Sequence, residues 1–446
     1  MLGLTTGGLV VLIITLLLGF YMAWTIGAND VANSMGTVFG SGKLSLKKII
    51  LIAALFEFLG AFLVGAHVTN TLKGGIVDPM YFQNEDFFSG DTGIYIFVAG
   101  MMAVLLAASL WVTLATYKSL PISTSQSIVG AVAGFGVIAV ILGDIPLKAL
   151  SGETLIQISI GWVLSPILGG VMSFLIFLLI RKAIFNAEFP EERAQKLIAF
   201  FIGLVFFIII LAGISGGLKN LRDVLEGFMP LTLVNAIFAE SWLRILVVGI
   251  MSAVLGVLGG IYVKRSRKLK ALKSVDRVET MFGGLLILTA CYVAFAHGAN
   301  DVANAVGPVA AISQVIMSNE ISSNVAVPVW VLALGGVGIV FGVSTWGYRV
   351  MNTIGKKITK ITPTRGFAAS FGAASSVLVC SMFGIPVSTS QIIVGAVIGV
   401  GLAGGITAID LRVIRNIIIS WVFTIPIAAV TTAVLFLIFR AIALNL

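Results

Sequence analysis

The sequence predicts an all-α polytopic membrane protein made of two inverted-topology repeats. Three observations support this: the composition, a series of long apolar runs, and two motifs that each occur twice. Of the 446 residues, 59% are hydrophobic and 11% are charged, and the mean hydropathy is +1.10. A chain this apolar falls outside the range of water-soluble domains.

The apolar runs are long enough to cross a bilayer as helices, because a hydrocarbon core of about 30 Å requires about 20 residues. The alternating pattern of a membrane β-barrel is absent. We expect about 12 transmembrane segments. Two of them are expected to be interrupted, and the regions 93–142 and 366–405 could each be two full spans or a re-entrant hairpin. The segments are 8–39 (interrupted), 49–69, 93–117, 121–142, 154–180, 197–217, 241–262, 281–318 (interrupted), 326–347, 366–384, 386–405 and 412–438.

The distribution of charge predicts the orientation. Segment 264–277 carries seven basic residues against one aspartate, so the positive-inside rule places it in the cytoplasm. Segment 72–92 has four acidic residues against one lysine, and the count of segments places it outside. The net charge of +9 therefore reflects cytoplasmic loops rather than nucleic-acid binding. We expect a multi-pass protein of the plasma or inner membrane with both termini extracytoplasmic.

Two motifs recur in the two halves of the chain. GANDVAN occupies residues 27–33 and 298–304, and PISTSQSIVGAVAG at 121–134 matches PVSTSQIIVGAVIG at 386–399 in eleven of fourteen positions. An odd number of segments separates corresponding points, so the second copy should be inverted in the membrane. Inverted repeats of transporters place broken helices and their binding sites near the midplane. The predicted units are a first repeat, 1–182, a central helix pair with a basic cytoplasmic loop, 183–277, and a second repeat, 278–446.

Each GANDVAN places one carboxylate and two amides between apolar stretches. Glycine tolerates backbone conformations that other residues resist, so we expect both helices to loosen there. Freed carbonyl oxygens, carboxylates and amide oxygens suit a hard cation such as Na⁺. The alternative is that each aspartate only caps a helix at a membrane boundary. The predicted cation ligands are Asn29, Asp30 and Asn33 in the first copy, and Asn300, Asp301 and Asn304 in the second.

The STSQ motifs are typical of helix starts, because proline and hydroxyl residues precede an apolar run. The unpaired N–H groups and the positive end of the dipole at such a start favour an anion. Two such starts from opposed repeats could hold a tetrahedral oxyanion. The alternative is ordinary capping. The predicted anion ligands are Ser123, Thr124, Ser125 and Gln126, with Ser388, Thr389, Ser390 and Gln391.

The two motifs together predict symport. Cations at the aspartates favour an anion at the helix starts, and by linkage the anion favours the cations. Glu57, in the middle of a predicted span, is assigned a cation or coupling role, with a structural ion pair as the alternative. His67 and His297 are expected to be structural, although His297 adjoins the second motif and could support it. We expect Na⁺ as the coupling ion, and we expect no cofactor.

At these motifs the sequence resembles the inorganic phosphate transporter family, in both halves and over most of the chain. The segments GANDVANS (27–34) and AHGANDVANAVGP (296–308) and the two PxSTSQ stretches carry the resemblance. It implies inverted repeats, Na⁺-coupled import of phosphate and a homodimer. It assigns Asp30, Asn33, Asp301 and Asn304 to cations and the STSQ clusters to phosphate.

The leading hypothesis is therefore a Na⁺-coupled phosphate symporter working by alternating access. A proton-coupled phosphate permease or a sulfate permease of the same family is an alternative, and an anion channel is another. A membrane enzyme is disfavoured, because the sequence lacks a nucleotide-binding P-loop and a metal-ligand cluster of the kind that membrane hydrolases use. No enzyme activity is expected.

Overall fold

The computed structural model describes residues 6–72, 75–83, 88, 91–215, 230–238, 241–265, 274–321, 327–382, 387–405 and 408–444. Within these ranges the chain is helical, as predicted, and contains only two isolated β-bridges. The principal helices are α1 (Thr6–Ser41), α2 (Leu46–Leu72), α3 (Thr92–Tyr117), α4 (Thr124–Ile141), α5 (Gly152–Ile180), α6 (Pro190–Ser215), α8 (Leu231–Phe238), α9 (Ser241–Arg265), α11 (Ser274–Ser318), α12 (Val329–Thr345), α13 (Gly347–Asn352), α14 (Pro363–Met382), α15 (Thr389–Ala403) and α16 (Leu411–Ala443). Short turns of 3₁₀- and π-helix are η1 (Pro79–Gln83), η2 (Leu147–Ala149), η3 (Arg181–Phe185) and η4 (Thr353–Lys357).

Each of the twelve predicted segments coincides with one of these helices. Among the described residues, nine helices are long and apolar enough to cross a membrane, or ten if α12 and the bent segment after it form one span. Fewer than the twelve expected spans are found because α14 is too polar and α15 is too short to span. Parts of the basic segment 264–277 and of the acidic segment 72–92 lie outside the described residues.

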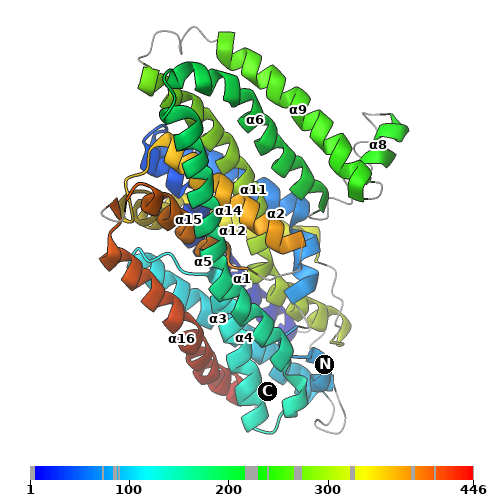
Figure 1. Cartoon of the computed structure of the whole chain (residues 1–446). Helices are drawn as coiled ribbons and strands as arrows, with labels where there is room; N and C mark the ends of the chain where they lie inside the picture. The colour runs from blue at the N-terminus through cyan, green and yellow to red at the C-terminus, as the bar shows by residue number, and fades with distance from the viewer. Residues whose placement is uncertain are drawn as a thin grey trace.

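The helices pack in reciprocal pairs (Figure 1). Helix α1 packs against α12, and the corresponding helix α11 packs against α2. Helices α3 and α4 pack against α16, whereas α14 and α15 pack against α5. Each half therefore contributes its last helix to the hairpin of the other half, as expected for two repeats related by a two-fold axis. Helices α6 and α9 pair with each other in an outer layer.

The expected loosening at GANDVAN is wrong. Both copies lie within continuous helices, α1 and α11, and the interrupted segments 8–39 and 281–318 are not interrupted there. The glycines allow two helices to approach closely instead. A Cβ at Gly27 would overlap the carbonyl group of Ile339 on α12, and one at Gly298 would overlap that of Glu57 on α2. The helix breaks fall beside the STSQ motifs, before α4 and before α15.

Gly298→Ala should destabilise the fold by about 1–3 kcal/mol, because the methyl group has no space at the crossing of α11 and α2. Gly284→Ala, in the same helix, is the matched control: no heavy atom lies within 4 Å of its added Cβ. The control should be neutral or stabilising by up to about 1 kcal/mol. Thermal unfolding of the purified variants checks this, and equal melting temperatures would contradict the close-crossing explanation.

Candidate functional site

The site is centred on Asp30, which is fully buried in the interior of α1. Thr124, the first residue of α4, donates a hydrogen bond to its Oδ2 over 2.6 Å. Ser390, in the first turn of α15, donates to its Oδ1 over 3.0 Å. Asn33, one turn along α1, donates to the same oxygen over 3.1 Å. One carboxylate therefore joins the starts of two helices from the two halves of the chain.

The predicted helix starts at the STSQ motifs are confirmed. Ser123 caps α4 by accepting a hydrogen bond from the Gln126 N–H over 3.1 Å, and Ser388 caps α15 by accepting one from Gln391 over 3.3 Å. Capping of this kind satisfies one of the free N–H groups of the first turn and leaves others available. Both glutamine side chains are buried, and their Oε1 atoms have no hydrogen-bond partner within the described residues.

The second GANDVAN converges on the same place. Asn304 donates to Ser125 Oγ over 3.3 Å, which mirrors the 2.8 Å bond from Asn33 to Ser390. Asp301 is buried, and its carboxylate, that of Asp30 and the His297 ring offer ligand atoms within 4.8 Å of one another. The two motifs therefore form one cluster, whereas the sequence suggested two separate cation sites. Both aspartates lie inside helices, which rules out the capping alternative.

The first asparagine of each motif lies outside the core of the cluster: Asn29 bonds elsewhere, and Asn300 contacts Asp301 from an exposed position. Asn29 donates to Thr116 Oγ1 over 2.9 Å and to the Leu120 carbonyl over 3.1 Å. Its Oδ1 accepts from the Ile122 N–H over 3.2 Å, so its amide holds the turn between α3 and α4. Asn300 is exposed and donates to Asp301 Oδ1 over 3.0 Å. Thr389, among the predicted anion ligands, is half-buried.

His297 is more central than the sequence suggested. Its Nε2 lies 2.5 Å from Asp301 Oδ2 and 3.9 Å from Asp30 Oδ2, and its Nδ1 lies 3.8 Å from Glu57 Oε1. Glu57 is fully buried and accepts a hydrogen bond from Ser34 over 3.1 Å. Three carboxyl groups therefore surround one imidazole. Buried charges of this kind require compensation by positive charge. The side chain of His67 lies outside the described residues.

Glu57 and His297 lie at only one of the two equivalent helix crossings, that of α2 with α11. Glu57 lies against Gly298 as Ile339 lies against Gly27. By the spacing of the motifs, His297 corresponds to Ile26. The crossing of α2 with α11 therefore has an ionisable pair where the crossing of α12 with α1 has two buried isoleucines. Neither GANDVAN copy alone reveals this difference between the two crossings, because Glu57 lies on α2, outside both copies.

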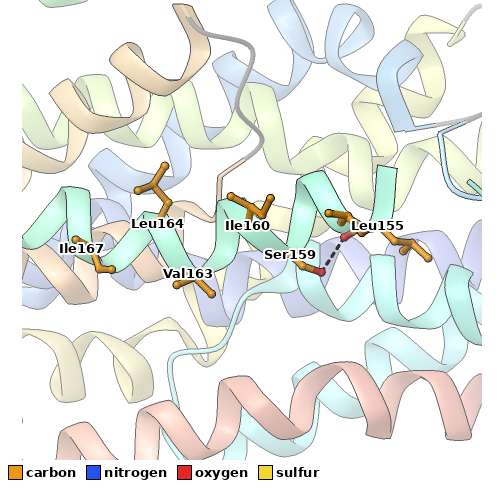
Figure 2. A pocket seen from close by; sticks show the side chains of 7 residues that line it. Leu155, Ser159, Ile160, Val163, Leu164 and Ile167 are labelled. Atoms are coloured by element: carbon orange, nitrogen blue, oxygen red, sulfur yellow. Dashed lines mark hydrogen bonds between the residues drawn. The ribbon is translucent and has the colours of Figure 1, made fainter. Parts of the chain in front are cut away.

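A surface hollow on α5 is not part of this site. It has a volume of about 580 Å³ and is lined by Leu155, Ile156, Ile160 and neighbouring side chains of the same helix. Figure 2 shows these apolar side chains, with the single hydroxyl of Ser159 turned back onto its own helix; it donates to the Leu155 carbonyl over 2.7 Å. Such a face offers no group that would bind an ion, and it suits contact with lipid.

The chain has known relatives. The sequence pattern of the phosphate transporter family matches residues 26–432, which include both GANDVAN copies and both STSQ segments. The chain belongs to this family. It is 40% identical over 429 residues to a Pyrococcus horikoshii protein that carries the name phosphate permease, covering 95% of this chain and 97% of that one. It is 38% identical over 442 residues to the chloroplastic inorganic phosphate transporter 2-1 of Arabidopsis thaliana, covering 95% and 71% respectively.

A solved structure described as the sodium-dependent phosphate transporter has the same fold. The TM-score is 0.79 at 37% identity, and the match covers 97% of this chain and 100% of that one. Members of the phosphate transporter family are permeases, so the expectation that this protein is a phosphate transporter and not an enzyme is confirmed. The alternative of a membrane enzyme is thereby set aside.

Asn29→Ala is expected to destabilise this phosphate transporter by about 1–3 kcal/mol, because it leaves the buried Ile122 N–H without a partner. Asn300→Ala removes the corresponding amide of the second motif, which is exposed, and should change stability by less than about 0.5 kcal/mol. The comparison uses thermal unfolding in detergent. A similar effect of both substitutions would show that Asn29 does not hold the turn.

Proposed function

We propose that this phosphate transporter is a secondary active symporter that imports inorganic phosphate together with Na⁺. The observation that carries the proposal is the pair of hydrogen bonds that Asp30 accepts from Thr124 and Ser390. The Asp30 carboxylate, which is best suited to bind a cation, thus contacts the two helix starts that are best suited to bind an anion. Binding one ion lowers the cost of placing the other in this buried site, and the effect is reciprocal.

The cation region comprises Asp30, Asn33, Asp301 and Asn304: the two carboxylates offer oxygen ligands, and the asparagine amides donate beside them to Asp30 and Ser125. Oxygen ligands of this kind suit Na⁺, and the solved relative is described as sodium-dependent. Na⁺ is the coupling ion in this proposal. Glu57 has a coupling role, because its carboxylate approaches the cluster only through His297 and Ser34.

Phosphate binds between the starts of α4 and α15. Each start combines free backbone N–H groups with hydroxyl donors and the positive end of a helix dipole. The Ser125 and Ser390 hydroxyls already contact the cation-region asparagines, and the buried Gln126 and Gln391 extend the same first turns. The phosphate ligands in this proposal are the eight STSQ side chains predicted from the sequence.

Transport proceeds by alternating access between two inverted repeats, 1–182 and 278–446, through rocking or an elevator-like slide. The support is the reciprocal packing, in which α1 and α12 form the counterpart of α11 and α2. Inverted repeats built this way can exchange conformations across a shared midplane site. The central unit 183–277 contains the separate pair α6 and α9. A homodimer in the plasma or inner membrane, with both termini extracytoplasmic, completes the proposal.

Uptake of radiolabelled phosphate into proteoliposomes tests coupling, with Na⁺ and proton gradients imposed separately and sulfate as a competitor. Accumulation driven by the Na⁺ gradient alone is the expected result. Accumulation driven only by the proton gradient would identify a proton-coupled permease, and strong competition by sulfate would broaden the substrate class. Phosphate movement that never exceeds its own gradient would indicate a channel.

Asp30→Asn should reduce Na⁺-driven phosphate uptake at least tenfold, because it removes the charge that balances a dehydrated cation. The amide keeps the size of the side chain, so folded protein should still reach the membrane. Glu153→Gln, an exposed carboxylate in the first turn of α5, is the control and should leave uptake unchanged. Normal Na⁺ dependence in purified, folded Asp30→Asn would refute the cation assignment.

A further inference from the structure

Arg349 is a charged residue in the bent segment after α12, and the transport mechanism has not yet used it. The segment bends by 56° after α12, and Arg349 lies in α13, just beyond the bend. A Cβ at Gly347 would meet the side chain of Val31, and one at Gly355 would meet Gly36 and Gly40. The bent segment therefore runs along the second half of α1, and its Gly347 packs beside the first GANDVAN. Arg349, two residues further along, is a functional candidate because of its contacts with the α3–α4 turn.

The guanidinium of Arg349 is held in an aromatic cage. Its central carbon lies 4.9 Å from the ring centroid of Trp346, 5.5 Å from that of Tyr117 and 5.8 Å from that of Tyr348. Rings at these distances stabilise a cation outside bulk water. Its Nη1 donates to the Tyr117 carbonyl oxygen over 3.3 Å. Tyr117 is the last residue of α3.

The end of α3 lies close to the start of α4. Asn29 contacts both sides of the connection, because its amide bonds Thr116 in the last turn of α3 and the Ile122 N–H just before the cap of α4. The carboxyl end of a helix carries a partial negative charge of about half an elementary charge, and the amino end carries a similar positive charge. Uncompensated, the end of α3 would repel an anion at the start of α4.

We propose that Arg349 is a positioning residue for phosphate: its positive charge neutralises the carboxyl end of α3 and thereby strengthens anion binding at the amino end of α4. The inference rests on the proposed phosphate site. Thr353 offers a comparison within the same bent segment, because its hydroxyl donates to the Ser119 carbonyl in the α3–α4 turn over 2.8 Å without adding charge. Arg349 and Thr353 thus hold the same turn, and only Arg349 changes its electrostatics.

The test measures phosphate half-saturation of Na⁺-driven uptake in proteoliposomes for Arg349→Gln, Arg349→Met and Arg349→Lys. Both neutral variants should raise the half-saturation for phosphate about tenfold. A cation at a partly buried helix end can contribute about a tenfold difference in an equilibrium constant. Lysine, which keeps the charge, should stay within about threefold of the wild type. The half-saturation for Na⁺ and the maximal rate should change less than about twofold, because the cation ligands are intact. Thr353→Val is the uncharged control and should leave phosphate half-saturation within about twofold.

Three outcomes would overturn the inference. One is an unchanged half-saturation in both neutral variants. Another is a phosphate half-saturation close to that of the wild type in Arg349→Gln but raised in Arg349→Lys. This would show that the hydrogen-bond donor matters and the charge does not. If neither neutral variant folds, a tenfold rise in folded Arg349→Lys would overturn it as well. Ser390→Ala separates this inference from the proposed site: a raised half-saturation there, with Arg349→Gln unchanged, refutes only the role of Arg349. Unchanged values in Ser390→Ala and Thr124→Val refute the phosphate site and the inference together.

Discussion

The structure depends on a single buried carboxylate that accepts hydrogen bonds from two helix starts. Asp30 connects α4 and α15, which belong to different halves of the chain. An ionised group with no exposed surface is tolerated only with such partners and with compensating positive charge. The same contact that satisfies the carboxylate orients the N–H-rich ends of both helices toward it. The geometry that makes the fold self-consistent is therefore also the geometry that would bind two ions of opposite sign together.

Rigid helices carry this cluster. Helices α1 and α11 pass through the centre without a break, and glycines at both motifs bring the backbones of α12 and α2 into contact with them. Within the described residues, the helix breaks beside the cluster precede α4 and α15. Three side chains hold the turn before α4: Asn29 from α1, and Arg349 and Thr353 from the bent segment after α12. Rigid supports and short breaks of this kind place polar backbone at depth without exposing it to lipid.

Much of the fold and part of the site were predictable from the sequence. The apolar runs located all twelve helices, although α14 and α15 fall short of spans, and the repeated motif suggested two cation sites where the structure has one cluster. Hydroxyl residues after proline correctly predicted the start of α4. The role of Gly27 was not predictable, because its identity does not reveal which carbonyl of another helix it faces. The central place of His297 was not predictable either, because two of its three carboxylate partners, Asp30 and Glu57, are distant in sequence.

The unequal halves of the cluster have an energetic consequence. Two identical repeats that exchange roles would give inward-facing and outward-facing conformations of equal free energy, because each is the image of the other. Glu57 on α2 and His297 on α11 lie at one crossing between the repeats, whereas Ile339 on α12 and Ile26 on α1 lie at the equivalent crossing, so this degeneracy would be broken. In the proposed alternating-access cycle, the difference in ion-pair environment would set a resting preference, and about 1.4 kcal/mol shifts the populations tenfold. The ionisable pair would thus make the two conformations unequal in free energy, while the ion gradients set the direction of transport.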